Sequence, residues 1–266
     1  MQFYSIFAAV KELAQIISPI ATELAQFEAF FEKTLHADTE PMDSIMRYVG
    51  DTRGKRLRPV LVLLCAKLFG QVNERTVRAA TFVELVHSAT LLHDDVVDDA
   101  DERRGRSSVK AQFGNLSAVL AGDFLLAKAM LLLSEPGDHA ILQEMLRTTA
   151  AMSEGELMQG ASVTTDAYLD IITRKTAMLM RSCCAAGALS VDATSEQVQQ
   201  IADFGINFGI LFQLRDDLLD GENMEQAQAL LPVYHEKALL ALEGFPPSEI
   251  IEALRDLTAF CAEREG

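Results

Sequence analysis

The chain has 266 residues and a formal net charge of −16 at pH 7, from 39 acidic and 23 basic side chains. This acidic balance argues against nucleic acid as a partner, and it means that an anionic substrate must meet local cations or bound metal. Hydrophobic residues make up 49% of the sequence and Trp is absent, while only 7 prolines and 15 glycines interrupt it, which favours a mostly helical fold.

The N-terminal stretch and the cysteines indicate a reducing compartment. The stretch MQFYSIFAAVKELAQ has neither a basic leader nor a small-residue cleavage site, so it does not resemble a signal peptide. The four cysteines include no C-x-x-C pair, and a disulfide between the adjacent Cys183 and Cys184 would be strained. We therefore expect a cytoplasmic location.

Helical periodicity recurs along almost the whole chain, and no segment alternates at period two over enough residues to indicate a strand. The predicted helices cover residues 5–35, 41–49, 59–69, 73–98, 112–133, 139–160, 166–189, 194–219, 224–243 and 247–264. Short breaks such as SEPGD and EGFPPS separate them, and no repeat or low-complexity linker divides the chain. These features predict an all-α fold, a single-domain bundle of long helices around a central cavity that spans residues 1–266.

A basic cluster precedes the predicted helix 59–69. The segment RGKRLRP places four cationic side chains within six positions: Arg53, Lys55, Arg56 and Arg58. Arginine forks and lysine ammonium groups are common ligands of diphosphates, although such a cluster on its own is more often a surface patch.

The predicted helix 73–98 ends in an unusual concentration of acid. Five aspartates fall within eight positions: Asp94, Asp95, Asp98, Asp99 and Asp101. At about 100° per residue, His87, Asp94 and Asp98 form one stripe on the helix, with Asp95 on its flank. Carboxylates one turn apart are ligands that a hard divalent cation prefers. The alternative is a solvated, fraying helix end, and this segment alone does not decide between the two.

The predicted helix 112–133 contains the apolar run AVLAGDFLLAKAMLLL. Asp123 and Lys128 interrupt that run, so we predict a helix buried on two sides and no transmembrane segment. The helix is also apolar on more sides than one core contact needs, which predicts a homodimer.

A second acidic motif lies near the end of the predicted helix 194–219. The segment QLRDDLLD carries Asp216, Asp217 and Asp220, with Gln213 one turn before them. Two D-D-x-x-D motifs that face each other across a cavity would repel strongly without cations between them. The pair of motifs therefore predicts a metal site.

Several spaced motifs identify a family resemblance: GKRLRP, ELVHSATLLHDDVVDDADERRG, GDFLLA, RKTA and FGILFQLRDDLLD. From about residue 45 to 220 the chain resembles a trans-isoprenyl diphosphate synthase of the bacterial long-chain polyprenyl type. The resemblance implies the isoprenoid synthase fold and a prenyltransferase that uses Mg²⁺ to condense isopentenyl diphosphate head-to-tail onto an allylic diphosphate. It also implies a homodimer, and a medium or long all-trans product that serves as a quinone side-chain precursor.

The resemblance also assigns roles to individual residues. The implied magnesium ligands are Asp94, Asp98 and Asp216, supported by Asp95, Asp217 and Asp220. The implied isopentenyl diphosphate ligands are Lys55, Arg58, His87 and Arg104, and those of the allylic diphosphate are Arg103, Lys175, Thr176 and Gln213. The implied catalytic residues are Asp94, Asp95, Asp98, Lys175, Asp216 and Asp217.

In the family, the residues one turn before the first acidic motif act as a floor for the growing product. Here they are Ala89 and Thr90, both small, which predicts a long product. The alternative is that these two residues only pack the helix.

Three other classes of protein fit the sequence less well. A di-iron bundle would need two Glu-x-x-His pairs, and the chain has one, ELVH at 84–87. A non-catalytic subunit of a two-component synthase tends to lose the aspartate motifs, both of which are present here. A terpene cyclase would not need the basic groups around Lys55 and Arg58.

The sequence departs from the family after Asp220. The family continues with a lid rich in glycine and lysine, whereas residues 221–236 contain no lysine. We predict that a lid segment is missing or deleted near residues 220–225. A segment left out of a structure would appear as neighbouring Cα atoms separated by much more than about 3.8 Å.

Overall fold

The computed structural model describes residues 12–51, 54–134, 138–159 and 164–264, and over these residues the fold is an α-helical bundle with one short hairpin. The prediction of an all-α bundle is confirmed. The helices of the first half are α1 (Leu13–Ile16), α2 (Ala21–Leu35), α3 (Glu40–Gly50), α4 (Leu57–Phe69), α5 (Glu74–Val97), α6 (Val109–Phe113) and α7 (Asn115–Leu132). Those of the second half are α8 (His139–Met158), α9 (Thr165–Ile172), α10 (Met178–Ser190), α11 (Ser195–Asp220), α12 (Met224–Ala241) and α13 (Glu249–Glu263).

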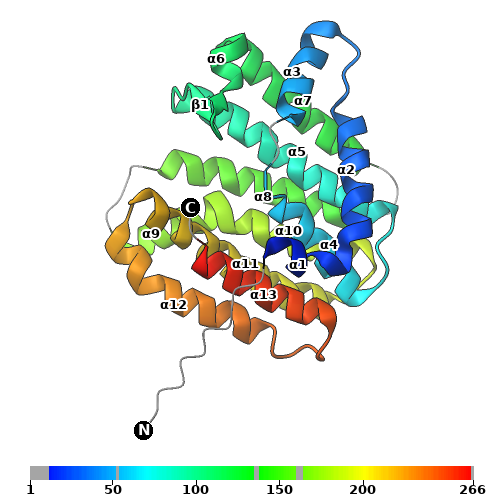
Figure 1. Cartoon of the computed structure of the whole chain (residues 1–266), viewed down its shortest axis with the longest axis vertical. Helices are drawn as coiled ribbons and strands as arrows, with labels where there is room; N and C mark the ends of the chain where they lie inside the picture. The colour runs from blue at the N-terminus through cyan, green and yellow to red at the C-terminus, as the bar shows by residue number, and fades with distance from the viewer. Residues whose placement is uncertain (1–11, 52–53, 135–137, 160–163, 265–266) are drawn as a thin grey trace.

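The core is built where α4, α5, α10 and α11 pack together, with α5 running through the middle of the molecule (Figure 1). The sequence of α4, LRPVLVLLCAKLF, is apolar almost all round, as a helix surrounded by others must be. Helices α12 and α13 cover one side of this core, while α3, α6 and α7 lie at the opposite end (Figure 1). All four cysteines are buried and free.

The structure interrupts three of the predicted helices. The predicted helix 5–35 is interrupted by a 3₁₀ turn, Ser18–Ile20, because Pro19 lacks the N–H that a continuing α-helix would use; residues 5–11 lie outside the described part. The predicted helix 112–133 is split at Gly114, whose φ of 87° ends α6 before α7 begins.

The predicted helix 166–189 contains a π-helical turn, Thr173–Ala177, between α9 and α10. The sequence also did not predict the small hairpin that follows α5, in which β1 (Glu102–Arg103) pairs with β2 (Arg106–Ser107). Arg104 and Gly105 form its turn with φ values of 54° and 72°, the left-handed conformation that such tight turns require.

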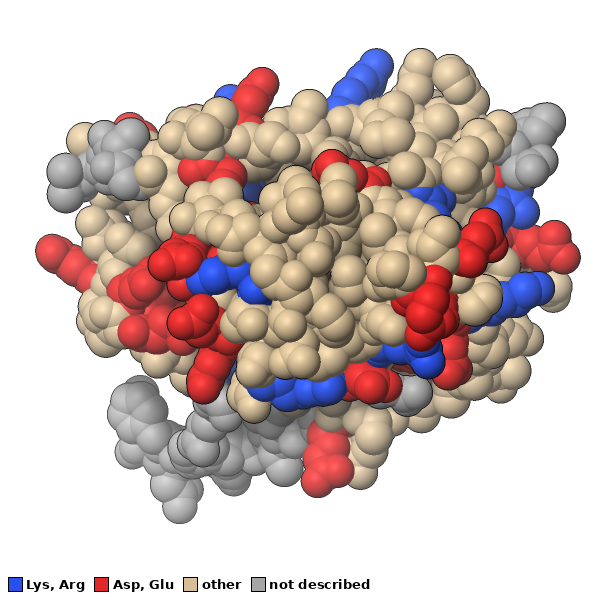
Figure 2. All heavy atoms as spheres, turned by 90° about the horizontal axis from the view of Figure 1, so that it is seen from above, with Lys and Arg blue, Asp and Glu red and all other residues tan. Residues whose placement is uncertain are grey.

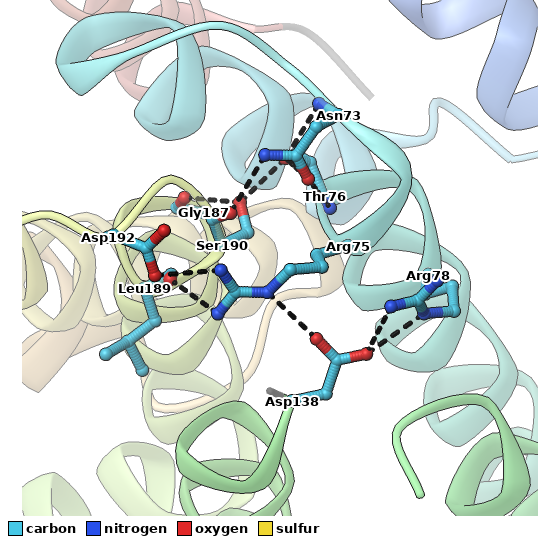
Figure 3. Close-up of polar contacts among 9 residues, drawn as sticks. All are labelled: Asn73, Arg75, Thr76, Arg78, Asp138, Gly187, Leu189, Ser190 and Asp192. Carbon is cyan, nitrogen blue, oxygen red and sulfur yellow. Dashed lines mark hydrogen bonds and ion pairs between the residues drawn. The ribbon is translucent and has the colours of Figure 1, made fainter. Parts of the chain in front are cut away.

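An ion-pair cluster around one buried aspartate fixes the end of α5 that lies furthest from the acidic motif (Figure 3). The wholly buried Asp138, at the start of α8, accepts hydrogen bonds from Arg75 Nε at 3.0 Å and Arg78 Nη2 at 2.6 Å. Arg75 also reaches Asp192, just beyond α10, at 2.8 Å. The cluster therefore ties α5, α8 and the end of α10 together.

Helix α7 lies on the outside of the chain, so the prediction that it is buried on two sides is wrong. Among the described helices it is the one whose length and composition would suit a membrane span, and only 28% of that span is buried. Its exposed large apolar side chains are Leu116, Val119, Leu120, Met130 and Leu131. Figure 2 shows a broad uncharged face of the molecule with acidic groups gathered beside it.

Helix α11 passes directly into α12 through a turn of three residues. Gly221 and Asn223 both have positive φ, 75° and 45°, and the backbone N–H of Glu222 donates to the carbonyl of Asp217 at 2.8 Å. The absence of a lid segment here stays a prediction.

Candidate active site

Two neighbouring cavities open at the end of the bundle where α5 and α11 carry their aspartates. The first, here called the aspartate cavity, has a volume of about 530 Å³ and is lined by Asp94 and Asp98. The second, the arginine cavity, has a volume of about 620 Å³ and is lined by Lys55 and Arg104. Three residues line both cavities and form the wall that they share: Arg58, His87 and Asp216.

Carboxylates from three helices face the aspartate cavity. Asp94 lies in α5 and Asp98 directly follows that helix, while Glu156 comes from α8 and Asp216 from α11. Burial and the neighbouring Glu156 raise the pKa of Asp94 from 3.8 to about 6, although Lys175 opposes this change. Burial likewise raises the pKa of Asp216, against the lowering effect of Arg264. Asp94 therefore feels the charges of Glu156 and Asp98, and this repulsion is costly unless a cation joins the carboxylates.

The second aspartate of the first motif has a different position from the first. Asp95 is buried and does not line the aspartate cavity. One of its carboxylate oxygens accepts hydrogen bonds from Nε and Nη2 of Arg103, at 2.8 and 2.5 Å. Asp95 therefore holds Arg103, which itself lines the cavity, in place.

The second aspartate of the second motif is also buried. Asp217 accepts hydrogen bonds from Tyr168 Oη at 2.5 Å, Gln213 Nε2 at 2.7 Å and Asn223 Nδ2 at 3.3 Å. Burial and the bond to Asp217 raise the pKa of the Tyr168 hydroxyl, so it remains a donor. Asp217 thus connects α9, α11 and the turn before α12. Asp220 is exposed at the end of α11 and lines neither cavity.

The remaining aspartates of the first acidic run lie outside both cavities. Lys110 Nζ donates to Asp99 at 2.6 Å and to Asp101 at 3.1 Å. This ion pair braces the hairpin against α6.

The oxygen donors of the aspartate cavity suit a divalent cation that keeps other ligands. Within the described ranges, no three His, Cys, Asp or Glu side chains come close enough together to hold a metal unaided. Magnesium usually retains several waters and takes only one or two carboxylates together with substrate phosphates. Asp94, Asp98 and Asp216 all line the cavity, so one or two of them could bind a magnesium ion together with waters and substrate phosphates.

The two predicted sets of phosphate ligands line different cavities, apart from Arg58 and His87, which line both. All four residues of the predicted isopentenyl diphosphate set line the arginine cavity: Lys55, Arg58, His87 and Arg104. All four of the predicted allylic set line the aspartate cavity: Arg103, Lys175, Thr176 and Gln213. Arg53 lies outside the described residues, and Arg56 is engaged by Glu84 at 2.5 Å and Glu28 at 3.1 Å.

Local structure explains how the basic groups reach these positions. Burial, Arg58 and Arg104 lower the pKa of His87 well below its ordinary value, so the ring is neutral at pH 7 and can donate one hydrogen bond. A Cβ at Gly54 would lie 2.6 Å from Arg104 Nη1, so the guanidinium lies directly against the backbone of Gly54. On the other side, Thr176 Oγ1 donates to Gln213 Oε1 at 2.7 Å.

Sequence reasoning missed two charged residues of the site. Glu156 lies in the segment EGELMQ, two positions after Glu154 and outside any recognisable acidic motif. Arg264 lies far along the chain in sequence, yet it lines the arginine cavity and its Nη2 lies 2.5 Å from Asp216 Oδ1. Its guanidinium also packs on the Phe212 ring, 4.2 Å from the centroid. Only the tertiary fold brings these side chains to the aspartates.

The two residues predicted to set product length differ in exposure to the site. Thr90 lines the aspartate cavity and donates to the carbonyl of His87 at 2.9 Å. Ala89 is fully buried and does not line that cavity.

Comparison with known proteins adds independent findings. The pattern of the family described as Polyprenyl synthetase matches residues 39–228. The chain is 31% identical over 240 residues to the octaprenyl diphosphate synthase of Escherichia coli (strain K12), covering 84% of this chain and 74% of that protein. It is 33% identical over 272 aligned positions to heptaprenyl diphosphate synthase component 2 of Geobacillus stearothermophilus, covering 93% of this chain and 84% of that protein.

Solved structures give the same picture of the fold. A polyprenyl synthase from Caulobacter crescentus CB15, complexed with calcium and isoprenyl diphosphate, superposes with a TM-score of 0.89 at 26% identity. The match covers 97% of this chain and 99% of that one. A decaprenyl diphosphate synthase from Rhodobacter capsulatus superposes with a TM-score of 0.86, also at 26% identity, over 94% of this chain and 98% of that one.

Proposed function

Since this chain belongs to the polyprenyl synthetase family, we propose that it is a prenyltransferase that makes a medium- or long-chain all-trans polyprenyl diphosphate. Prenyl synthases in general use isoprenyl diphosphates and depend on a divalent metal. In this proposal the metal is Mg²⁺, the substrates are isopentenyl diphosphate and an allylic diphosphate, and the product supplies a quinone side chain.

The observation that carries this proposal is the pair of cavities with a shared wall. A condensation of two diphosphates needs two anion sites that meet where the new carbon–carbon bond forms. The aspartate cavity has the carboxylates for a cation-bound diphosphate, and the arginine cavity has cations but only a few carboxylates. Arg58, His87 and Asp216 stand between them.

The residues of the aspartate cavity would hold the allylic diphosphate. Bound Mg²⁺ would stabilise the negative charge of the leaving diphosphate, with Asp94, Asp98 and Asp216 as its ligands. Lys175, Arg103, Gln213 and Thr176 would bind phosphate oxygens and fix the orientation of the allylic carbon. Asp95 and Asp217 serve as supporting residues, through Arg103 and Gln213, and Asp220 adds negative charge near Asp216.

The residues of the arginine cavity would hold the second substrate. Lys55, Arg58 and Arg104 supply positive charge, and the neutral His87 donates a hydrogen bond to the isopentenyl diphosphate. The allylic C–O bond breaks, and the isopentenyl double bond attacks the allylic cation. A proton is then lost to the departed diphosphate, which leaves a double bond in a product five carbons longer.

The alternative of a di-iron bundle lacks support. Its single Glu-x-x-His pair contributes Glu84, and that carboxylate is already engaged by Arg56. The basic side chains of both cavities would also have no role in such a protein.

We propose a homodimer that forms through α7. The exposed leucines of α7 favour burial against a second copy of the chain over exposure to water. A cytoplasmic location belongs to the same proposal, and the four free cysteines are consistent with it.

We also propose that this chain lacks the lid that normally follows the second motif. The alignment with the heptaprenyl relative extends over 272 positions, more than the 266 residues of this chain, so that relative has residues with no counterpart here. Without a lid, water reaches the cation, so we expect more prenyl alcohol per condensation than a synthase with a lid releases.

The test of the proposed function is direct. The purified chain is incubated with Mg²⁺, farnesyl diphosphate and labelled isopentenyl diphosphate, and the dephosphorylated products are separated by chromatography. We expect labelled polyprenols longer than the primer, and their loss when Mg²⁺ is chelated. A folded protein that incorporates no label with any allylic primer would contradict the proposal.

A further inference from the structure

Glu156 of α8 is a fourth carboxylate in the aspartate cavity, and it belongs to neither aspartate motif. Its Oε2 lies 2.9 Å from Lys175 Nζ, and Gln159 Oε1 accepts a hydrogen bond from the same ammonium group. Lys175 also acts on Asp94, since its charge opposes the rise in the pKa of that carboxyl. The ammonium group is therefore within electrostatic reach of two carboxylates, and it is paired with the one outside the motifs.

The backbone around this ion pair is held closely. A Cβ at Gly155 would lie 2.7 Å from Arg174 Cβ and 2.8 Å from Lys175 N, so α8 touches the π-helical turn at this glycine. On either side of Gly155 an ion pair crosses the contact: Glu154 with Arg174 at 2.8 Å, and Glu156 with Lys175 at 2.9 Å. The first pair lies outside the aspartate cavity and the second inside it. Single π turns often occur at functional sites.

We propose that Glu156 is a positioning residue that holds the Lys175 ammonium against α8 and so prevents it from forming an ion pair with Asp94. This inference rests on the proposed function, in which Asp94 is a ligand of a divalent cation. If Lys175 paired with Asp94, a cation would have to displace the ammonium group before it could bind. With Lys175 held by Glu156 and Gln159, Asp94 stays open to the cation while Lys175 remains at the wall for an incoming phosphate.

The proposal explains an otherwise unfavourable arrangement. Glu156 lines the cavity together with Asp94, Asp98 and Asp216, so by itself it makes the site more repulsive. A fourth carboxylate helps cation binding only if it neutralises a positive charge that would otherwise pair with Asp94. Lys175 is that charge, because it is paired with Glu156 at 2.9 Å and lines the same cavity as Asp94.

The first experiment measures the binding of Mn²⁺ alone, through the paramagnetic resonance signal of the free ion. Glu156→Gln keeps the size of the side chain and removes its charge, and we expect the dissociation constant for Mn²⁺ to rise about threefold or more. The double variant E156Q/K175M should bind Mn²⁺ at least as tightly as the natural chain. The matched control is Glu154→Gln, which breaks the neighbouring pair with Arg174 outside the cavity and should leave Mn²⁺ binding unchanged.

Weaker Mn²⁺ binding by Glu156→Gln could result from movement of Lys175 or only from the loss of one negative charge near the cation. A crystal structure of the Glu156→Gln protein distinguishes these two explanations. We expect Lys175 Nζ to lie within ion-pair distance of Asp94 in that variant. In steady-state kinetics the KM for the allylic diphosphate should rise, while the KM for isopentenyl diphosphate should not.

The outcomes distinguish this inference from the function on which it rests. A natural chain that binds no Mn²⁺ would overturn the metal site and this inference together. A natural chain that binds Mn²⁺, combined with unchanged binding by E156Q or with Lys175 still against α8 in its structure, would overturn the role of Glu156 alone.

Discussion

Adjacent aspartates of one motif perform different tasks at the residue scale. Asp94 faces the aspartate cavity, whereas Asp95, one position along α5, is buried against Arg103. The helical rotation of about 100° per residue predicts that the two side chains diverge. It could not predict the partner of Asp95, because Arg103 is delivered by a hairpin that hydrophobic periodicity does not reveal.

Substitution of each aspartate tests this division. Asp94→Asn should lower kcat by about two orders of magnitude or more, because ionisation of the allylic diphosphate loses electrostatic support. It should not destabilise the chain, since it removes a repelled charge. Asp95→Asn should cost about 1–3 kcal/mol of unfolding free energy, because Arg103 loses its buried counter-ion. Steady-state kinetics and thermal unfolding measure the two effects, and near-normal turnover in Asp94→Asn with Mg²⁺ present would reject the assignment.

The raised pKa of Asp94 predicts a pH dependence of stability in the absence of metal. Between its ordinary value of 3.8 and about 6, the folded chain keeps a proton on Asp94 that the unfolded chain releases. This carboxyl therefore makes the free energy of unfolding fall as the pH rises through that window, by roughly 1 kcal/mol after solvent screening is allowed for. Asp94→Asn should remove this contribution. Denaturant titrations of both proteins at several pH values would show it, and identical pH slopes would contradict it.

At the element scale, periodicity predicted the long helices but not their interruptions. Helices α4, α5, α8 and α11 lie within a few residues of the predicted ranges, because each carries a sustained apolar pattern. The π-helical turn and the hairpin have no such pattern. The first lies against α8, where Gly155 contacts Arg174 and Lys175, and the second contains a turn of two residues with positive φ. Contacts of this kind depend on the packed fold.

The proposed floor that limits product length lies on α5. Thr90→Phe should place a ring in the aspartate cavity beneath the allylic tail and shorten the product by one or more isoprene units. Ala89 is fully buried outside the cavity lining, so Ala89→Phe should instead overpack the core, at about 1–3 kcal/mol. Chromatography of the dephosphorylated products and thermal unfolding distinguish the two variants. An unchanged product distribution in Thr90→Phe would mean that the floor lies elsewhere.

At the scale of the whole molecule, the outer face of α7 predicts self-association. Sedimentation should give about twice the chain mass of 29.2 kDa at micromolar concentration. Leu120→Glu should shift the protein towards monomer, because it places a charge on the proposed interface. Leu240→Glu on α12 is a matched control, since the two leucines are 50% and 51% exposed. A single-chain mass for the natural protein at every concentration would refute the dimer.

The Asp138 cluster holds one end of α5 in place, whereas the end that carries the aspartates can respond to bound metal and substrate. Arg75 and Asp94 are separated by about 28 Å along α5, at about 1.5 Å per residue. At the first position the helices are latched by opposite charges, and at the second they are pushed apart by like charges. Cations that bind at the aspartates should therefore draw the helices together at that end of the bundle, while the ion pairs of Asp138 keep the other end fixed. Amide exchange at residues 94–97 should accordingly slow when substrate and metal bind, while amide exchange at residues 77–80 stays slow throughout.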